Sequence, residues 1–251
     1  NDSQHTLVLG GVQDVCPTEK PNSFPTDMIY DVVIRTPYDF RVYVFDSHDK
    51  SDLYLNDSIE RGEVMPEGNT QLWIDAHSDD YRPDDDCGWA AVKVASHNRI
   101  ARHIWVSRKG SEAEDEELLN RAKKNLFIND EWARGKGREV LKGLIKEFRH
   151  FNFESYFSWA NRPRNCRVII NICTDVAKAE EINSFIRRLF LEDGVLPSVV
   201  HISTSPDHNS AYSGSGYLTG YGSISICKEV AAYTLQLTSS SCAKFLQNRK
   251  A

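Results

Sequence analysis

One stretch of the chain decides the prediction of the fold: Gln71-Leu72-Trp73-Ile74-Asp75-Ala76-His77-Ser78-Asp79. The part that ends at Ile74 is an apolar run typical of a buried strand. After it, Asp75, His77 and Asp79 place metal-binding residue types at every second position. Alternate residues of an extended backbone share a face, and α/β proteins bind ligands beyond the carboxyl ends of their strands. The stretch therefore predicts one site with three ligands at a strand end.

The bulk composition is that of a globular protein. The chain has 251 residues, of which 40% are hydrophobic and 26% charged, which is enough for one large core. No apolar run approaches the roughly 20 residues that cross a bilayer, and no signal peptide is visible. The net charge of −6 argues against a nucleic-acid binder and suits a cationic substrate or a divalent metal. We expect neither a membrane nor a nucleic acid as a partner.

The cysteines do not form a metal-ribbon or redox pattern. They are widely spaced, without a Cys-x-x-Cys pair: Cys16, Cys87, Cys166, Cys173, Cys227 and Cys242. A chain of this length does not need disulfides for stability. We expect mostly reduced cysteines and a cytoplasmic protein.

Strand-like and helix-like patterns alternate along the chain. Runs rich in β-branched and aromatic residues predict strands over 32–34, 42–45, 72–74, 104–106, 168–172 and 199–202. Apolar residues at helical spacing predict helices over 118–126, 140–148 and 182–190. Apolar strands separated by helices indicate a parallel sheet covered on both sides. We expect an α/β protein with three layers in a single domain over 1–251, including an N-terminal segment (1–30) and a possible lid loop (205–225).

Three of the predicted strands end in polar, metal-capable residues. His48 follows the run over 42–45, Asp75 follows 72–74, and Cys173 and Asp175 follow 168–172. A parallel sheet places all of these ends on one edge. The alternative for Asp175 or Thr174 is the N-cap of the helix over 182–190.

The order of these motifs resembles a known family. Asp-Ala-His-x-Asp is a signature of the arginase and deacetylase superfamily, and in its ureohydrolase branch a His-bearing loop precedes this motif and Ser-x-Asp-x-Asp follows it. His48 stands at the first ligand, Asp175 at the last, and the central motif is matched without a change. The residues around His48 and the stretch Ser203-Thr204-Ser205-Pro206 are similar to an arginase-like subgroup that includes the peptide arginases. The resemblance covers roughly residues 40 to 210.

The resemblance implies an arginase-like fold and a metal-dependent hydrolase that converts arginine side chains of peptides into ornithine and urea. It implies two manganese ions held by six residues: His48, Asp75, His77, Asp79, Cys173 and Asp175. Asp79 would bridge the metals or orient the attacking water, and His97 would carry the proton. Asp80 and Asp84 to Asp86 are either a solvated loop or an acidic rim that attracts the cationic arginine-containing peptide.

Cys173 departs from the family pattern because it stands where an Asp is usual, and Asn171 stands where Ser is usual. A thiolate favours zinc or iron over manganese, whereas a buried strand cysteine is also common without any metal. Two other functions stay open. One is a zinc-dependent deacetylase or amidohydrolase on the same fold, and the other is a non-catalytic binding protein with a degraded metal site.

Overall fold

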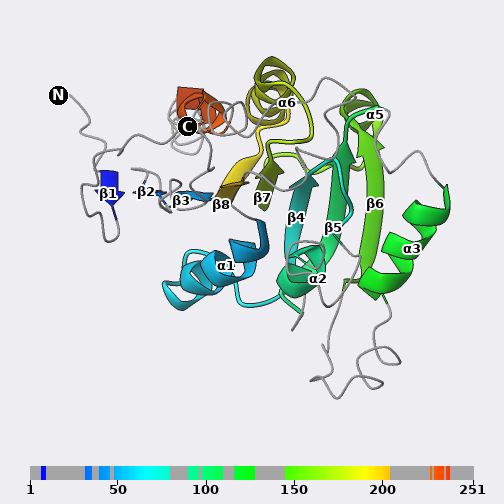
Figure 1. Ribbon diagram of the computed structural model, residues 1–251, viewed down its shortest axis with the longest axis horizontal. Coiled ribbons are helices and arrows are strands. Elements are labelled where there is room, and N and C mark those ends of the chain that lie inside the picture. The colour runs from blue at the N-terminus through cyan, green and yellow to red at the C-terminus, as the bar shows by residue number, and fades with distance from the viewer. Residues whose placement is uncertain are drawn as a thin grey trace, which may run out of the picture.

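The computed structural model describes residues 7–9, 32–35, 40–45, 48–79, 90–95, 98–109, 116–127, 145–203, 227, 229–234 and 236–237. These residues form one twisted sheet with helices on both of its faces (Figure 1). The predicted segments 1–30, apart from residues 7–9, and 205–225 lie outside the described residues. The single domain over 1–251 therefore stays a prediction.

The sheet has eight strands, in the order β1-β2-β3-β8-β7-β4-β5-β6. Their bounds are Leu7–Leu9 (β1), Val32–Arg35 (β2), Arg41–Phe45 (β3), Asn69–Ile74 (β4), Ile100–Ser107 (β5), Glu147–Asn152 (β6), Arg167–Cys173 (β7) and Leu196–Ser203 (β8). The six strands from β3 to β6 in this order are parallel, which confirms the α/β class. All six predicted strands fall within observed ones.

The sheet is not parallel throughout, which corrects the expectation. β1 pairs with β2, and β2 with β3, in antiparallel fashion. Arg35 and Arg41 are register partners across the second pair, so the link between these strands is very short. A parallel pair needs a crossover of a dozen or more residues, and this link cannot supply one.

The helices alternate with the parallel strands. Their bounds are His48–Lys50 (η2, a 3₁₀ turn), Ser51–Glu60 (α1), Ala90–Ala95 (α2), Glu116–Phe127 (α3), Phe153–Ser158 (α5) and Ala179–Leu191 (α6). The helices predicted over 118–126 and 182–190 are confirmed by α3 and α6. The N-cap of α6 is Lys178, so the capping role considered for Asp175 or Thr174 is wrong. That result leaves the Asp175 carboxylate available to the strand-end site.

The helix predicted over 140–148 is wrong at its end, because residues 147 and 148 belong to β6. Phe148 is the register partner of His103 on β5, and the two rings stack with centroids 5.7 Å apart. β6 lies at the edge of the sheet, where few positions are buried. Its mixed polar and apolar sequence therefore lacks the continuous apolar run that identified the central strands.

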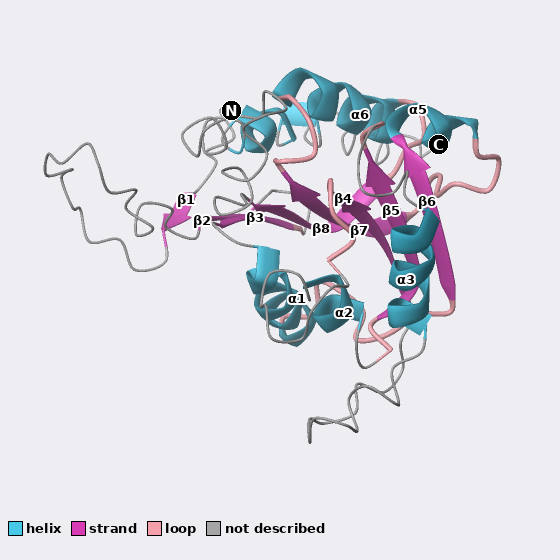
Figure 2. Ribbon diagram, turned by 45° about the vertical axis from the view of Figure 1, so that its right-hand side comes forward, coloured by secondary structure: helices cyan, strands magenta, loops and turns pink. Residues whose placement is uncertain are grey.

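Two apolar cores lie on opposite faces of the sheet and make three layers (Figure 2). On one face, Trp73 and Trp105 pack with side chains of α1, α2 and α3, such as Leu55. On the other face, Leu72 and Ile104 pack with α5 and α6. Within the described part of the chain, none of the helices has the length and apolarity needed to span a membrane.

Candidate metal centre

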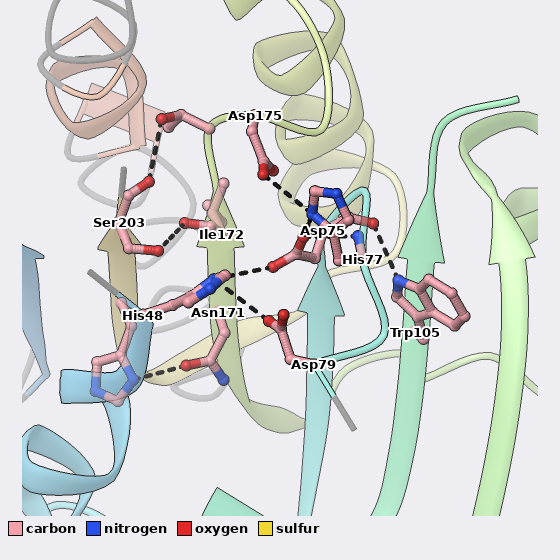
Figure 3. Close-up of polar contacts among 11 residues, drawn as sticks. His48, Asp75, His77, Asp79, Trp105, Asn171, Ile172, Asp175 and Ser203 are labelled. Carbon is pink, nitrogen blue, oxygen red and sulfur yellow. Dashed lines mark hydrogen bonds and ion pairs between the residues drawn. The ribbon is translucent and has the colours of Figure 1, made fainter. Parts of the chain in front are cut away.

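The carboxyl ends of β3, β4 and β7 bring the polar residues of the three motifs together. β7 lies beside β4 with Ile172 opposite Ile74, so Cys173 and Asp75 leave the two strands next to each other. On the other side of β7, the strand β8 separates β7 from β3. The 3₁₀ turn η2 follows β3 and places His48 against the same edge (Figure 3).

Asp75 lies between the two histidines of the site (Figure 3). Its Oδ2 is 3.2 Å from Nδ1 of His48, and its Oδ1 is 3.6 Å from Nδ1 of His77. The backbone N–H of His77 also donates a hydrogen bond to Oδ1 at 2.8 Å, which fixes the carboxylate in the turn after β4. The Asp75 side chain is 1% exposed, so this arrangement is formed away from bulk water.

Each histidine also faces a second carboxylate. Asp79 Oδ2 lies 3.3 Å from Nδ1 of His48, and Asp175 Oδ2 lies 3.2 Å from Nδ1 of His77. Asp79 has a φ of 49°, a left-handed conformation in which Asp and Asn are enriched. Asp79 combines this backbone conformation with a carboxylate that is buried beside His48.

Hydrogen bonds to the backbone hold the strand ends in place. The indole N–H of Trp105 donates to the carbonyl of Asp75 at 3.0 Å, and the N–H of Asp75 donates to the carbonyl of Val106 at the same distance. Directly after β7, the backbone N–H and the hydroxyl of Thr174 both donate to the carbonyl of Ser203, at 3.0 and 3.1 Å. The backbone at Asp75, and at Thr174 between Cys173 and Asp175, is thus tied to the neighbouring strands.

The charges of the site act strongly on one another. Burial by itself lowers the pKa of each imidazole, but Asp79, Cys173 and Asp75 raise the pKa of His48 well above its ordinary value. In the same way, Asp175 and Asp75 outweigh burial and raise the pKa of His77 to about 12. Burial also raises the pKa of Asp75, yet the hydrogen bonds from the two histidines lower it below its usual range.

The Cys173 thiol lies within the same charged cluster. Burial raises its pKa well above the ordinary value, and the charges of Asp175 and Asp75 act in the same direction, whereas His48 lowers it. Protons on the two imidazoles therefore balance the negative charge of the carboxylates. A divalent cation has to displace them, so its binding strengthens as the pH rises.

The residues fit a bound divalent metal. They make two groups, His48 with Asp75 and Cys173, and Asp75 with His77 and Asp175, and in each group the ligand atoms lie within 4.8 Å of one another. Ligands about 2.0–2.3 Å from one ion lie roughly 3–4.5 Å apart, so little movement is needed. Asp175 Oδ1 is buried and accepts no hydrogen bond from any described residue, as a carboxylate oxygen reserved for a cation would.

All six residues expected to bind metal converge on this one edge: His48, Asp75, His77, Asp79, Cys173 and Asp175. Their role as ligands stays a prediction. The carboxylate that belongs to both groups is Asp75, whereas Asp79 contacts the His48 side. The role expected for Asp79, bridging the metals or orienting the attacking water, stays a prediction. His97, Asp80 and Asp84 to Asp86 lie outside the described residues.

The sequence motifs did not show two buried side-chain contacts of the strands that carry the site. Trp105 is the register partner of Trp73, and no local pattern shows that its N–H reaches Asp75. Asn171 and His201 form a buried pair, with Oδ1 of Asn171 2.7 Å from Nδ1 of His201. Nδ1 carries the proton in this pair, because the amide oxygen can only accept. Register across β7 and β8, rather than spacing along the chain, joins these two side chains.

Comparison with known proteins gives no family for this arrangement. No protein-family model matches the chain, and a search of curated proteins gives no match.

Proposed function

We propose that the chain is a metal-dependent hydrolase of C–N bonds, and specifically a peptide arginase that converts peptidyl arginine to ornithine and urea. The observation that carries the proposal is the position of Asp75, whose two carboxylate oxygens face different histidines, each of which faces a further carboxylate. A pair of metal sites that share a carboxylate is the arrangement used to activate water for hydrolysis. The resemblance of the motifs to the ureohydrolase branch supplies the substrate class.

The reaction needs no cofactor besides the metals. Water adds to the guanidinium carbon, the bond from this carbon to the side-chain nitrogen breaks, and a guanidinium ion plus water becomes urea plus an alkylammonium ion. When bound, a divalent pair supplies Lewis acidity and lowers the pKa of water toward neutrality.

The residues of the chain have separate tasks in this proposal. Asp75 would hold the two ions at a fixed separation, because its oxygens are already aimed at both halves of the site. Asp79 would orient the attacking water from the His48 side, where its carboxylate is buried. Both tasks rely on groups that are positioned before substrate binds, and such preorganisation is a major source of rate enhancement.

The test combines metal analysis with mass spectrometry. Protein purified without chelators is analysed for metals, loaded with manganese, and incubated with an arginine-containing peptide and with free arginine. We expect loss of CN₂H₂ from the peptide. The Asp75→Asn variant should bind metal at neither half and should be inactive, whereas Glu192→Gln, which changes an exposed ion pair with Arg188, should behave as the parent. Two bound manganese ions without conversion of either substrate would refute the peptide arginase proposal.

A zinc-dependent deacetylase is the second candidate, and Cys173 favours it. A set of one imidazole, one carboxylate and one thiolate, as in His48, Asp75 and Cys173, suits a single zinc ion better than manganese. One zinc per chain together with deacetylation of an acetyl-lysine peptide would support this candidate over the arginase.

A further inference from the structure

The two halves of the metal centre differ in their chemistry although they share Asp75. The first half contains the imidazole of His48, the carboxylate of Asp75 and the sulfur of Cys173, and all three residues are buried. The second half contains Asp75, His77 and Asp175, and its ligands are oxygen and nitrogen only. The two donor sets therefore differ in whether they contain sulfur.

We propose that Cys173 makes this a mixed-metal centre, in which the His48 half binds a thiophilic ion such as zinc and the Asp175 half binds an oxygen-preferring ion such as manganese. The inference rests on the metal binding in the proposed function and adds which ion each half selects. Selection follows from the donors together with the supply of each metal, because thiolates favour zinc and related ions while carboxylates and water also suit manganese.

The fold places the Cys173 side chain where it can act as a ligand. Cys173 is the last residue of β7. The neighbouring strand β4 ends directly before Asp75. Its side chain interacts with His48 and lies close enough to Asp75 and Asp175 for their charges to act on it. A buried cysteine that served only packing would not need three ligand-type neighbours.

The first half can also reach the coordination number that zinc prefers. Zinc in proteins is usually four-coordinate and tetrahedral. Asp79 Oδ2 lies 3.3 Å from the same Nδ1 of His48 that faces Asp75, so it can approach an ion there as a fourth ligand. The second half has two carboxylates and one imidazole, and it can complete a larger oxygen-rich shell with water, as manganese requires.

Cobalt is the spectroscopic probe for the thiolate. Co²⁺ bound to a thiolate has an intense charge-transfer absorption in the near ultraviolet, which Co²⁺ bound to oxygen and nitrogen lacks. Chelator-stripped protein is titrated with Co²⁺, and we expect this absorption to saturate with one equivalent. The Cys173→Ser variant should lose the absorption, and its zinc affinity should fall by at least about a hundredfold. Cys227→Ser is the matched control, because Cys227 is also buried but its sulfur faces the carbonyl of Ile202.

A second measurement tests selection between metals. Stripped protein is given one equivalent of zinc and an excess of manganese, because zinc outcompetes manganese at almost any site when the two are equal, and bound metals are counted by elemental analysis. The parent should hold one zinc and one manganese, whereas Cys173→Asp, in which both halves contain only oxygen and nitrogen ligands, should retain less of the zinc. Two bound cobalt ions without a thiolate absorption, or equal retention of zinc by the parent and Cys173→Asp, would overturn the mixed-metal inference and leave the hydrolase proposal standing. A thiolate absorption without turnover of arginine peptides would support the inference and count against the arginase.

Discussion

The indole N–H of Trp105 donates a hydrogen bond to the backbone carbonyl of Asp75 at 3.0 Å. This contact fixes the strand end from which the shared carboxylate projects, and the donor is a buried side chain of the neighbouring strand β5. Mutation of residues that orient metal ligands typically weakens metal binding by about 10–100-fold. Trp105 is therefore a positioning residue in the proposed centre.

Replacing this donor should weaken metal binding. Trp105→Phe leaves the Asp75 carbonyl without its donor, so we expect metal affinity to fall about 10–100-fold and the free energy of unfolding to fall by about 1–3 kcal/mol. The measurements are calorimetric metal titration and denaturant unfolding.

Trp73→Phe is the matched control for this prediction, because Trp73 is the register partner of Trp105 and equally buried. Its Nε1 has no hydrogen-bond partner among the described residues. Trp73→Phe should destabilise the fold with a smaller loss of affinity. Equal losses of affinity in the two variants would show that packing, and not the hydrogen bond, supports the site.

Asp79 should be required for activity but not for folding. Asp79→Asn keeps the volume of the side chain and a residue type that tolerates the φ of 49°, whereas Asp79→Ala would add backbone strain to the loss of the carboxylate. We expect turnover of the arginine peptide to fall at least about a hundredfold in Asp79→Asn, with an unchanged circular dichroism spectrum. A folded variant with the turnover of the parent would remove Asp79 from the proposed mechanism.

The extent to which these features follow from sequence depends on the range of the interactions that produce them. The central strands and α6 were predictable because burial imposes a local pattern. A strand buried on both faces, such as β7 with Ile170, is apolar throughout, and a helix buried on one face, such as α6 with Ile186, has apolar residues at helical spacing. The convergence of His48, Asp75 and Asp175 was predictable from strand polarity alone. By contrast, β6, the sharing of Asp75 and the Trp105 hydrogen bond depend on which strands are neighbours, and that order is not encoded in spacing along the chain.

Two glycines with positive φ offer a stability test away from the metal centre. Gly194 follows α6 with a φ of 64°, and a Cβ there would lie 2.5 Å from Oδ1 of Asn165, whereas Gly62 has a φ of 73° and open space around it. Gly62→Ala should cost about 1–2 kcal/mol from the backbone alone. Gly194→Ala should cost more, because Asn165 also has to move. Denaturant unfolding measures both, and equal losses would show that Asn165 moves aside without cost.

Buried neutral histidines should make the fold sensitive to acid. His103 lies on β5, between β4 and β6 in the sheet, and is fully buried. Its Nδ1 lies 3.2 Å from Oε1 of Gln71, and burial lowers the pKa of His103 to about 3. The unfolded chain has an ordinary histidine pKa of about 6.5. Between these values the unfolded state binds a proton that the folded state does not, so the free energy of unfolding falls as the pH decreases and is unaffected by His103 above about 6.5.

The size of this effect is about 1.4 kcal/mol for each pH unit below 6.5. His201 is also buried and its pKa is lowered to about 3, so it adds a second contribution of the same sign. We expect His103→Gln to reduce the loss of stability between neutral pH and about pH 5 by roughly 2 kcal/mol relative to the parent. Both proteins are unfolded with denaturant in the presence of a chelator, so that the charged metal ligands contribute equally to each. If the two proteins lost the same stability over this range, His103 would be protonated in the folded state, and the assignment of a neutral, buried imidazole would be wrong.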